Sequence, residues 1–177
     1  MRIINLGENE PGDSGCEAAH GLSFYVETEN HKLLFDSSPS GVVIRNAKKI
    51  GVDFCDGQYI QDEFHHEQNL LLTSGGKKIL FCGCAHNGIL NVMETLERKF
   101  GSAMLPDLVI GGFHLMKRTE FSEADTAEVT EIANRLESYK SHFATCHCTG
   151  LPVFNQMKEI MGDQLSYVRS GDEVLVE

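Results

Sequence analysis

The sequence lacks the features that mark membrane-inserted and secreted proteins. No apolar run approaches the roughly 18 consecutive residues that a membrane-spanning helix requires, which argues against an integral membrane protein. Residues 1–15 contain no basic segment followed by an apolar stretch of about 7–15 residues, so no secretory signal is recognisable. We therefore expect a cytoplasmic protein without a membrane partner.

Positive charge is also scarce. The 15 Lys and Arg residues stand against 26 Asp and Glu residues, which gives a formal net charge of −11. Binding to a nucleic-acid backbone requires a basic face, so we expect no nucleic-acid partner. The 177 residues are 41% hydrophobic and 23% charged, an ordinary globular composition, and we predict a single domain over residues 1–177.

The six cysteines are too few for a disulfide scaffold, and we expect them to be reduced. Four of them form two C-x-C pairs, Cys82/Cys84 and Cys146/Cys148, each with a histidine in or beside it, in FCGCAH and TCHCTG. Alternate residues of a strand point to one face, so the four sulfurs could form a structural zinc site or a redox module. They could equally be small buried hydrophobes.

Hydrophobic periodicity predicts an alternation of strands and helices. Two hairpins, each followed by a helix, lead into alternating strand and helix units, a pattern typical of an α/β sandwich with helices outside the sheets. In the segment SEAD, Ser122 and Asp125 resemble a helix-opening capping box. The predicted strands are 2–6, 22–28, 32–36, 69–73, 78–82, 108–111, 142–146, 165–168 and 173–176, and the predicted helices are 41–50, 87–100, 122–139 and 151–161.

Polar clusters stand at the ends of four predicted strands. Asp36 ends one strand, Cys84 and His86 follow another, and His114 and His147 follow two more. Ligands of open α/β sheets bind beyond the strand ends, and thiolates and imidazoles are ligands of zinc and iron. A single histidine of this kind is usually no more than a hydrogen-bonded polar residue. The gathering of four clusters is what predicts a site.

Seven segments, in this order along nearly the whole chain, resemble the metallo-β-lactamase superfamily: EAAHGLSFYVET, KLLFDSSPSG, NAKKIGVDF, DEFHHEQNLLL, ILFCGCAHNGILN, IGGFHL and TCHCTGL. Within it, the chain is similar to the branch of 7,8-dihydropterin-6-methyl-4-(β-D-ribofuranosyl)-aminobenzene-5′-phosphate synthase-like metal-dependent hydrolases. The resemblance implies an αββα sandwich and a hydrolase that acts on a small molecule, a pterin or a phosphate ester.

The H-x-H-x-D-H motif of that superfamily is absent from this sequence. It is expected after GVDF, but GVDFC runs directly into DGQYIQDEFHHEQ. The resemblance therefore implies that an internal segment is lacking near residue 55, either through a deletion or because the sequence as given omits it. A true deletion would expose sheet edges, which favours a homo-oligomer, and would make a non-catalytic ligand- or partner-binding protein the alternative function.

The resemblance also assigns roles to individual residues. His66, His86 and His147 match metal ligands, and Cys84 stands at the place of a bridging aspartate. These residues would hold a divalent metal, zinc in the first place and otherwise iron or manganese, with up to two ions that activate water. His114 and His20 would bind substrate or assist proton transfer. Asp36 would orient a ligand histidine.

Overall fold

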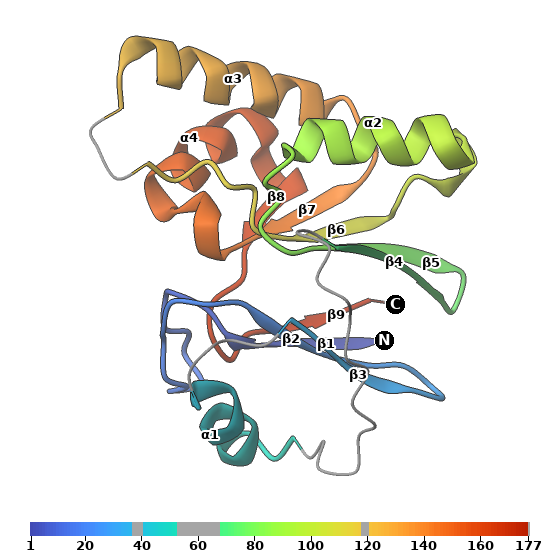
Figure 1. The fold of residues 1–177 in the computed structure, drawn as a ribbon, viewed down its shortest axis with the longest axis vertical. Coiled ribbons are helices and arrows are strands. Elements are labelled where there is room, and N and C mark those ends of the chain that lie inside the picture. Colours follow the sequence, from blue (N-terminus) through green and yellow to red (C-terminus); the bar gives the residue numbers. More distant parts are fainter. Residues whose placement is uncertain (37–40, 53–67, 118–120, 177) are drawn as a thin grey trace. The chain divides into compact units, whose positions relative to one another are not determined.

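Residues 1–36, 41–52, 68–117 and 121–176 are described by the computed structural model, which is drawn in Figure 1. They form two sheets and four α-helices, and the chain divides into two compact units. The first unit contains Met1–Gln68, Thr73–Lys77 and Val168–Glu177, and the second contains Asn69–Leu72 and Lys78–Tyr167. The junction near residue 55 and the predicted ligand His66 lie outside the described residues. Among those described, no helix is long and apolar enough to cross a membrane.

The first unit is built on a four-stranded sheet in the order β3-β2-β1-β9. Each of its neighbouring strands runs antiparallel to the next. Helix α1 (Val42–Lys49) packs its buried Val43 and Ala47 against Ile4, Leu6 and Tyr25 of this sheet. The strands are β1 (Arg2–Gly7), β2 (Ser23–Glu27), β3 (Lys32–Phe35) and β9 (Glu173–Leu175).

A buried asparagine fastens α1 to the rest of the first unit. Asn46 donates hydrogen bonds to the carbonyl oxygens of Leu6 (2.9 Å) and Glu17 (2.8 Å), and accepts one from the Glu17 backbone N–H (2.8 Å). Its polar atoms are thus satisfied inside the unit, as a buried amide requires.

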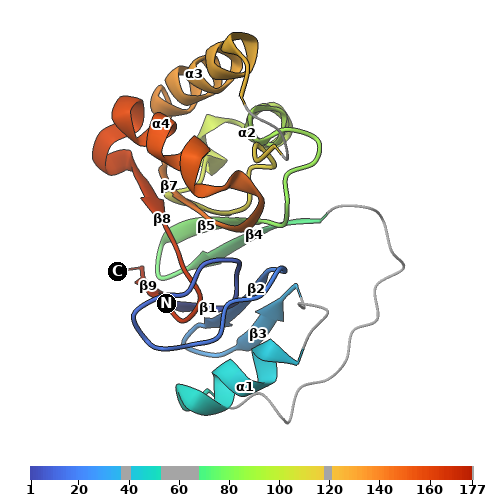
Figure 2. The ribbon, with the colours of Figure 1, turned by 90° about the vertical axis from the view of Figure 1, so that its left-hand side faces the viewer.

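The second unit holds a five-stranded sheet in the order β4-β5-β6-β7-β8, whose last four strands are parallel. Three helices connect these parallel strands and lie on one face of the sheet in both ribbon views (Figures 1 and 2). The strands are β4 (Asn69–Ser74), β5 (Lys77–Cys82), β6 (Leu108–Gly111), β7 (His142–Thr145) and β8 (Leu165–Tyr167), and the helices are α2 (Ile89–Phe100), α3 (Glu123–Glu137) and α4 (Leu151–Met161).

The helices and the sheet of the second unit enclose a continuous apolar core. Phe113 and Phe143 meet edge to face with their ring centroids 6.3 Å apart, and Met93 and Met157 fill the space beneath the helices, both fully buried. Aromatic pairs of this geometry add to the stabilisation that burial alone provides.

The local structure follows the sequence pattern closely. Gly75 and Gly76 connect β4 to β5 with φ angles of 59° and 79°, a conformation that two glycines adopt at little cost. The predicted capping box of α3 is present: Ser122 Oγ accepts a hydrogen bond from the Asp125 N–H (3.2 Å), and Asp125 Oδ2 accepts one from the Ser122 N–H (3.0 Å). Short 3-10 turns complete the second unit at Ser102–Met104, His147–Thr149 and Gly162–Gln164.

Candidate metal centre

The carboxyl ends of β5, β6 and β7 meet at one edge of the second sheet because these three strands are parallel neighbours. The chemically reactive side chains of the second unit come directly after these ends. Cys84 and His86 follow β5, His114 follows β6, and His147 and Cys148 follow β7. The predicted gathering of polar residues beyond strand ends is therefore present within this unit.

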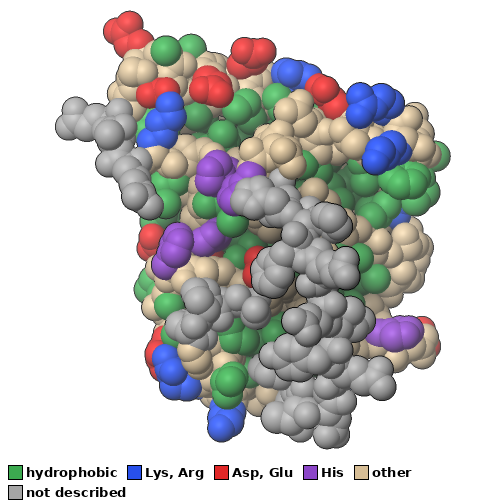
Figure 3. Space-filling model, in the orientation of Figure 1, with side chains coloured by type: hydrophobic (Ala, Val, Ile, Leu, Met, Phe, Trp, Pro, Cys, Tyr) green, Lys and Arg blue, Asp and Glu red, His purple; other side chains and the backbone are tan. Residues whose placement is uncertain are grey.

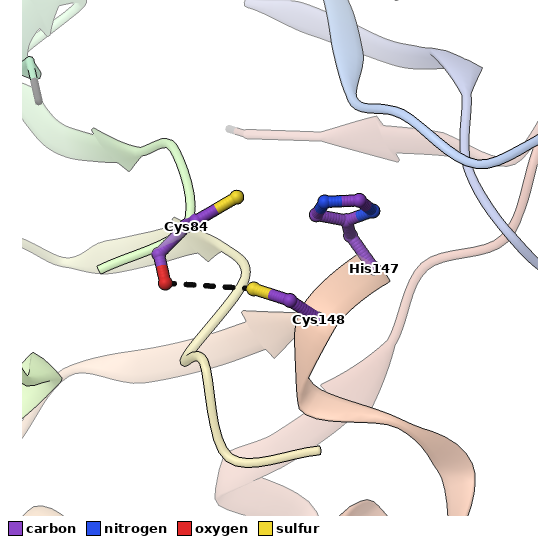
Figure 4. Close-up of side chains that lie close together, drawn as sticks. All are labelled: Cys84, His147 and Cys148. Atoms are coloured by element: carbon purple, nitrogen blue, oxygen red, sulfur yellow. Dashed lines mark hydrogen bonds between the residues drawn. The ribbon is translucent and has the colours of Figure 1, made fainter. Parts of the chain in front are cut away.

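Three of these residues form a compact group of potential metal ligands. The Sγ atoms of Cys84 and Cys148 and a ring nitrogen of His147 all lie within 4.8 Å of one another (Figure 4). His147 and Cys148 are buried, whereas Cys84 is partly exposed, so the group opens to solvent on the side of Cys84. Two thiols and an imidazole are a donor set that suits zinc. The residues present therefore fit a metal ion.

Backbone hydrogen bonds hold the loops that carry this group. The Gly112 N–H donates to the Gly83 carbonyl oxygen (2.9 Å), which ties the loop after β6 to the loop after β5. The Met116 N–H donates to the Cys148 carbonyl oxygen (2.9 Å), which ties the loop after β6 to the turn after β7. The ligand-bearing segments are thus fixed to a common frame.

Two buried threonines complete that frame. Thr149 Oγ1 accepts a hydrogen bond from the Phe113 N–H (2.9 Å) and lies 2.5 Å from Thr145 Oγ1. Thr145 Oγ1 also donates to the Gly111 carbonyl oxygen (3.2 Å). Because both hydroxyl groups are buried, their loss would leave backbone groups without partners in the interior.

The strand ends approach too closely for a side chain at two positions. A Cβ atom on Gly111, where φ is 150°, would lie 2.0 Å from the carbonyl oxygen of Cys82. A Cβ atom on Gly112 would lie 2.5 Å from the sulfur of Cys148. Glycine at these two positions is what allows β5, β6 and the Cys148 turn to come together.

Three residues of the site adopt left-handed backbone conformations that are unusual outside glycine. Their φ angles are 48° at Ala85, 54° at His114 and 51° at His147. A conformation of this kind costs about 1–3 kcal/mol and persists where the surrounding structure enforces it, commonly at functional sites. Here it occurs once after each of the three neighbouring strands, and at two of these positions the residue is a histidine.

The pKa values of the two thiols in the group are shifted in opposite directions. Hydrogen bonds from Cys148 and then from His147 lower the pKa of Cys84 to about 4, and the nearby charges of His147 and His86 act in the same direction. The same hydrogen bond to Cys84, together with burial, raises the pKa of Cys148. The Cys148 sulfur also lies 3.4 Å from the carbonyl oxygen of Cys84 (Figure 4). Of the two thiols, Cys84 is thus the more acidic.

A pair of exposed histidines stands beside the group. The rings of His86 and His114 meet edge to face, with centroids 4.3 Å apart and an interplanar angle of 65°. Exposed histidine side chains are visible in the space-filling view of Figure 3. His114 also lines a cavity of about 300 Å³, which is bounded further by Lys117, Phe121, Asp125 and Val129.

Comparison with known proteins decides the fold. A crystal structure of a metal-dependent hydrolase of the β-lactamase superfamily matches with a TM-score of 0.70 and 17% sequence identity, over 100% of this chain and 99% of that one. The fold is that of the metallo-β-lactamase superfamily. The predicted α/β class and the predicted resemblance to this superfamily are thus confirmed at the level of the fold.

Sequence relatives point in the same direction at lower coverage. An uncharacterized protein of Methanocaldococcus jannaschii is 28% identical over 137 residues, 75% of this chain and 47% of that protein. The 7,8-dihydropterin-6-methyl-4-(β-D-ribofuranosyl)-aminobenzene-5′-phosphate synthase of the same organism is 25% identical over 117 residues, 66% of this chain and 37% of that enzyme. The chain spans less than half the length of these curated relatives. No family model matches it.

The predicted site residues that the structure describes lie in three places. Cys84 and His147 lie together in the group of potential ligands, whereas His86 and His114 form the pair beside it. His20 is exposed in the first unit, and Asp36 follows β3 in that unit with a φ angle of 62°. The roles assigned to all of these residues, and to His66, stay predictions.

The four-sulfur alternative does not match the group that the structure assembles. Cys82 is the last residue of β5 and Cys146 directly follows β7, and both are completely buried. Among the described residues, the cluster contains only the second cysteine of each C-x-C pair, because the backbone turns between the two members. Cys148 was predicted as a ligand only in this four-sulfur alternative and not in the set with Cys84 and His147, although its place next to His147 in TCHCTG was the available signal.

Proposed function

We propose that this protein is a metal-dependent hydrolase that holds one divalent ion on Cys84, His147 and Cys148. The observation that carries the proposal is the convergence of these three donors within 4.8 Å, at strand ends of a metallo-β-lactamase fold. Three protein ligands with an open position are typical of a catalytic zinc site. Two sulfur donors favour zinc over manganese, while iron stays an alternative.

The chain's own residues would prepare the reaction in three ways. Cys84 already carries a lowered pKa and is therefore ready to serve as an anionic ligand. The hydrogen bonds of Thr149 and Gly112 keep the ligand-bearing loops in register. His114, which contacts the His86 ring and lines the 300 Å³ cavity, would hold a substrate oxygen or move a proton. A bound divalent ion would supply a water molecule of lowered pKa and polarise the substrate oxygen.

The apolar wall of the cavity and one relative support a class of substrate. Phe121 and Val129 offer an apolar wall that suits an aromatic ring. The charge of Lys117, by contrast, is paired with Asp125, and Glu128 adds a negative charge to the same cavity. The similarity to the dihydropterin-linked phosphate synthase supports a pterin or another phosphate ester as substrate. A second ion would need further ligands, for which His66 and His86 remain the predicted candidates.

Metal content and turnover test the proposal together. The full chain would be loaded with Zn²⁺, Mn²⁺ or Fe²⁺, assayed for bound metal, and offered an aryl phosphomonoester, an aryl phosphodiester and an aryl carboxylate ester. His147→Ala should lose both metal and activity. His142→Ala is the matched control, because His142 begins the same strand β7 and bonds to Ser166 Oγ (3.0 Å) away from the group.

The outcomes separate the two functions. Turnover that depends on added metal and disappears in His147→Ala, but not in His142→Ala, supports the hydrolase. Stoichiometric metal without turnover of any of the esters would contradict the hydrolase and favour the non-catalytic, ligand-binding alternative. If no metal binds to the wild-type chain, the metal centre itself is refuted.

A further inference from the structure

We propose that Cys84 and Cys148 form a reversible disulfide on oxidation, so that the same two sulfurs either bind a metal ion or are bonded to each other. Both cysteines are free thiols in the structure. They come from loops after two different strands, 64 residues apart in the sequence, and nothing in the C-x-C spacing pairs them. The disulfide itself depends only on this geometry, while its effect on a metal rests on the proposed function.

The side chains of the two cysteines already lie close together. Their sulfurs lie within 4.8 Å of each other, and the Cys148 sulfur reaches to 3.4 Å from the carbonyl oxygen of Cys84. A disulfide requires a sulfur–sulfur separation of about 2.05 Å, so the two side chains must rotate toward each other for the bond to form. The hydrogen bonds from Gly112 to Gly83 and from Met116 to Cys148 keep both loops in place during that rotation.

Exposure selects this pair among the described cysteines. Cys84 is partly exposed and can meet a small oxidant such as hydrogen peroxide. Cys82 and Cys146 are completely buried at the ends of β5 and β7, and Cys16 is buried in the first unit. Among the described cysteines, Cys148 is therefore the thiol that can react with an oxidised Cys84 to form a disulfide.

The reaction balances with one equivalent of peroxide. The Cys84 sulfur attacks a peroxide oxygen, the O–O bond breaks, and the products are a sulfenic acid on Cys84 and one water molecule. The Cys148 sulfur then attacks the Cys84 sulfur, the S–O bond breaks, and the hydroxyl group leaves with the Cys148 proton as a second water molecule. Both cysteines are oxidised and the peroxide is reduced. A dithiol reductant restores both thiols.

This chemistry would make the candidate metal centre sensitive to oxidation. A disulfide removes two of the three proposed ligands, because a ligating cysteine must be a thiolate. Metal and disulfide are therefore mutually exclusive, and a bound ion should protect the thiols. The partly exposed ligand acts as the sensor, and the buried ligand resolves the oxidation.

Peptide mapping tests the disulfide. The full chain, stripped of metal with EDTA, would be treated with stoichiometric hydrogen peroxide, alkylated in denaturant, digested with trypsin and analysed by mass spectrometry. Trypsin should release peptides 79–98 and 141–158, which hold two cysteines each. We expect these peptides to be joined after oxidation and separated by dithiothreitol. The joined species should persist in Cys82→Ser/Cys146→Ser and disappear in Cys84→Ser and in Cys148→Ser.

Each outcome has a distinct meaning. Free, alkylated Cys84 and Cys148 after oxidation, or Cys84 trapped as sulfinic acid, would overturn the inference, as would a link through Cys82 or Cys146. A parallel sample preloaded with zinc should resist cross-linking and then release one zinc ion for each disulfide formed. A disulfide in a chain that never binds zinc would leave this inference intact and refute the proposed function instead.

Discussion

The two members of each C-x-C pair occupy different environments. Cys82 and Cys146 lie at strand ends, completely buried, and Cys82 is part of the apolar core of the second unit. Cys84 and Cys148 lie two residues further along, where the chain has left the strand, and they meet each other and His147. A thiol at or directly after the last strand residue acts as a small hydrophobe, while a thiol two residues further along becomes a potential ligand. The end of the strand, and not the residue type, decides between the two.

Gly111→Ala should break this arrangement most severely. The new Cβ atom would lie 2.0 Å from the Cys82 carbonyl oxygen, on a residue whose φ of 150° disfavours side chains. Steric overlap and backbone strain each cost about 1–3 kcal/mol, so we expect a loss of about 2–6 kcal/mol in the free energy of unfolding. Urea denaturation measures it. Gly83→Ala is the control, since nothing lies within 4 Å of its Cβ, and equal stability of the two variants would contradict the close approach.

Serine substitutions of Cys82 and Cys84 should affect different properties, the stability of the protein in the first case and its zinc affinity in the second. Loss of a residue that only hydrogen-bonds to a metal ligand lowers metal affinity about 10–100-fold, and loss of a ligand atom itself should cost more. Cys84→Ser should therefore lower zinc affinity by more than about 100-fold. Cys82→Ser should keep the affinity but lose about 1–3 kcal/mol of stability, because it places a hydroxyl group in the core. Zinc titration and urea denaturation of both variants provide the measurements. Equal zinc affinities would mean that the two cysteines are not distinguished by the strand end.

Thr149→Val should show how far the frame of hydrogen bonds supports the second cysteine of the pair. The substitution keeps the side-chain shape but removes the acceptor of the buried Phe113 N–H. Leaving that donor without its partner costs about 1–3 kcal/mol. Thr73→Val, at an exposed position of β4, should change stability by no more than about 0.5 kcal/mol. A Thr149→Val protein as stable as the Thr73→Val protein would show that the hydrogen bond from the Phe113 N–H to Thr149 does not stabilise the fold.

The smallest expected effect concerns acid pH and the histidine that begins β7. Burial, aided by the charge of Lys158, lowers the pKa of His142 below its usual 6.5. The unfolded chain therefore takes up a proton more readily than the folded one below about pH 6.5, and stability should fall as the pH drops through that range. His142→Gln should flatten this part of the stability curve slightly. An unchanged curve between pH 7.5 and pH 5 would show that His142 does not contribute.

Periodicity alone predicted the strands and helices of both units to within a few residues, because apolar spacing decides which face of an element is buried. The capping residues Ser122 and Asp125 were recognisable for the same local reason. The predicted strand 142–146 extends one residue too far, since β7 ends at Thr145 and the chain turns at His147 with a positive φ angle. No local pattern marks such a turn when the residue is not glycine.

The candidate site was predictable only in part. Cys84 and His147 followed from the resemblance to a known superfamily, whereas Cys148 was predicted as a ligand only in the four-sulfur alternative. Its partnership with Cys84 depends on the contact between Gly112 and its sulfur and on hydrogen bonds between loops of three strands. Such contacts join residues far apart in the sequence, where spacing carries no information.

The sequence by itself determined the order of the elements, the superfamily resemblance and the residue types available at each strand end. These are local properties, set by side-chain chemistry and by the periods of helix and strand. The tertiary structure alone decided which cysteine of each pair joins the core and which joins His147. That choice depends on where parallel strands end side by side and on how closely glycine lets their backbones approach, and both are properties of the packed sheet.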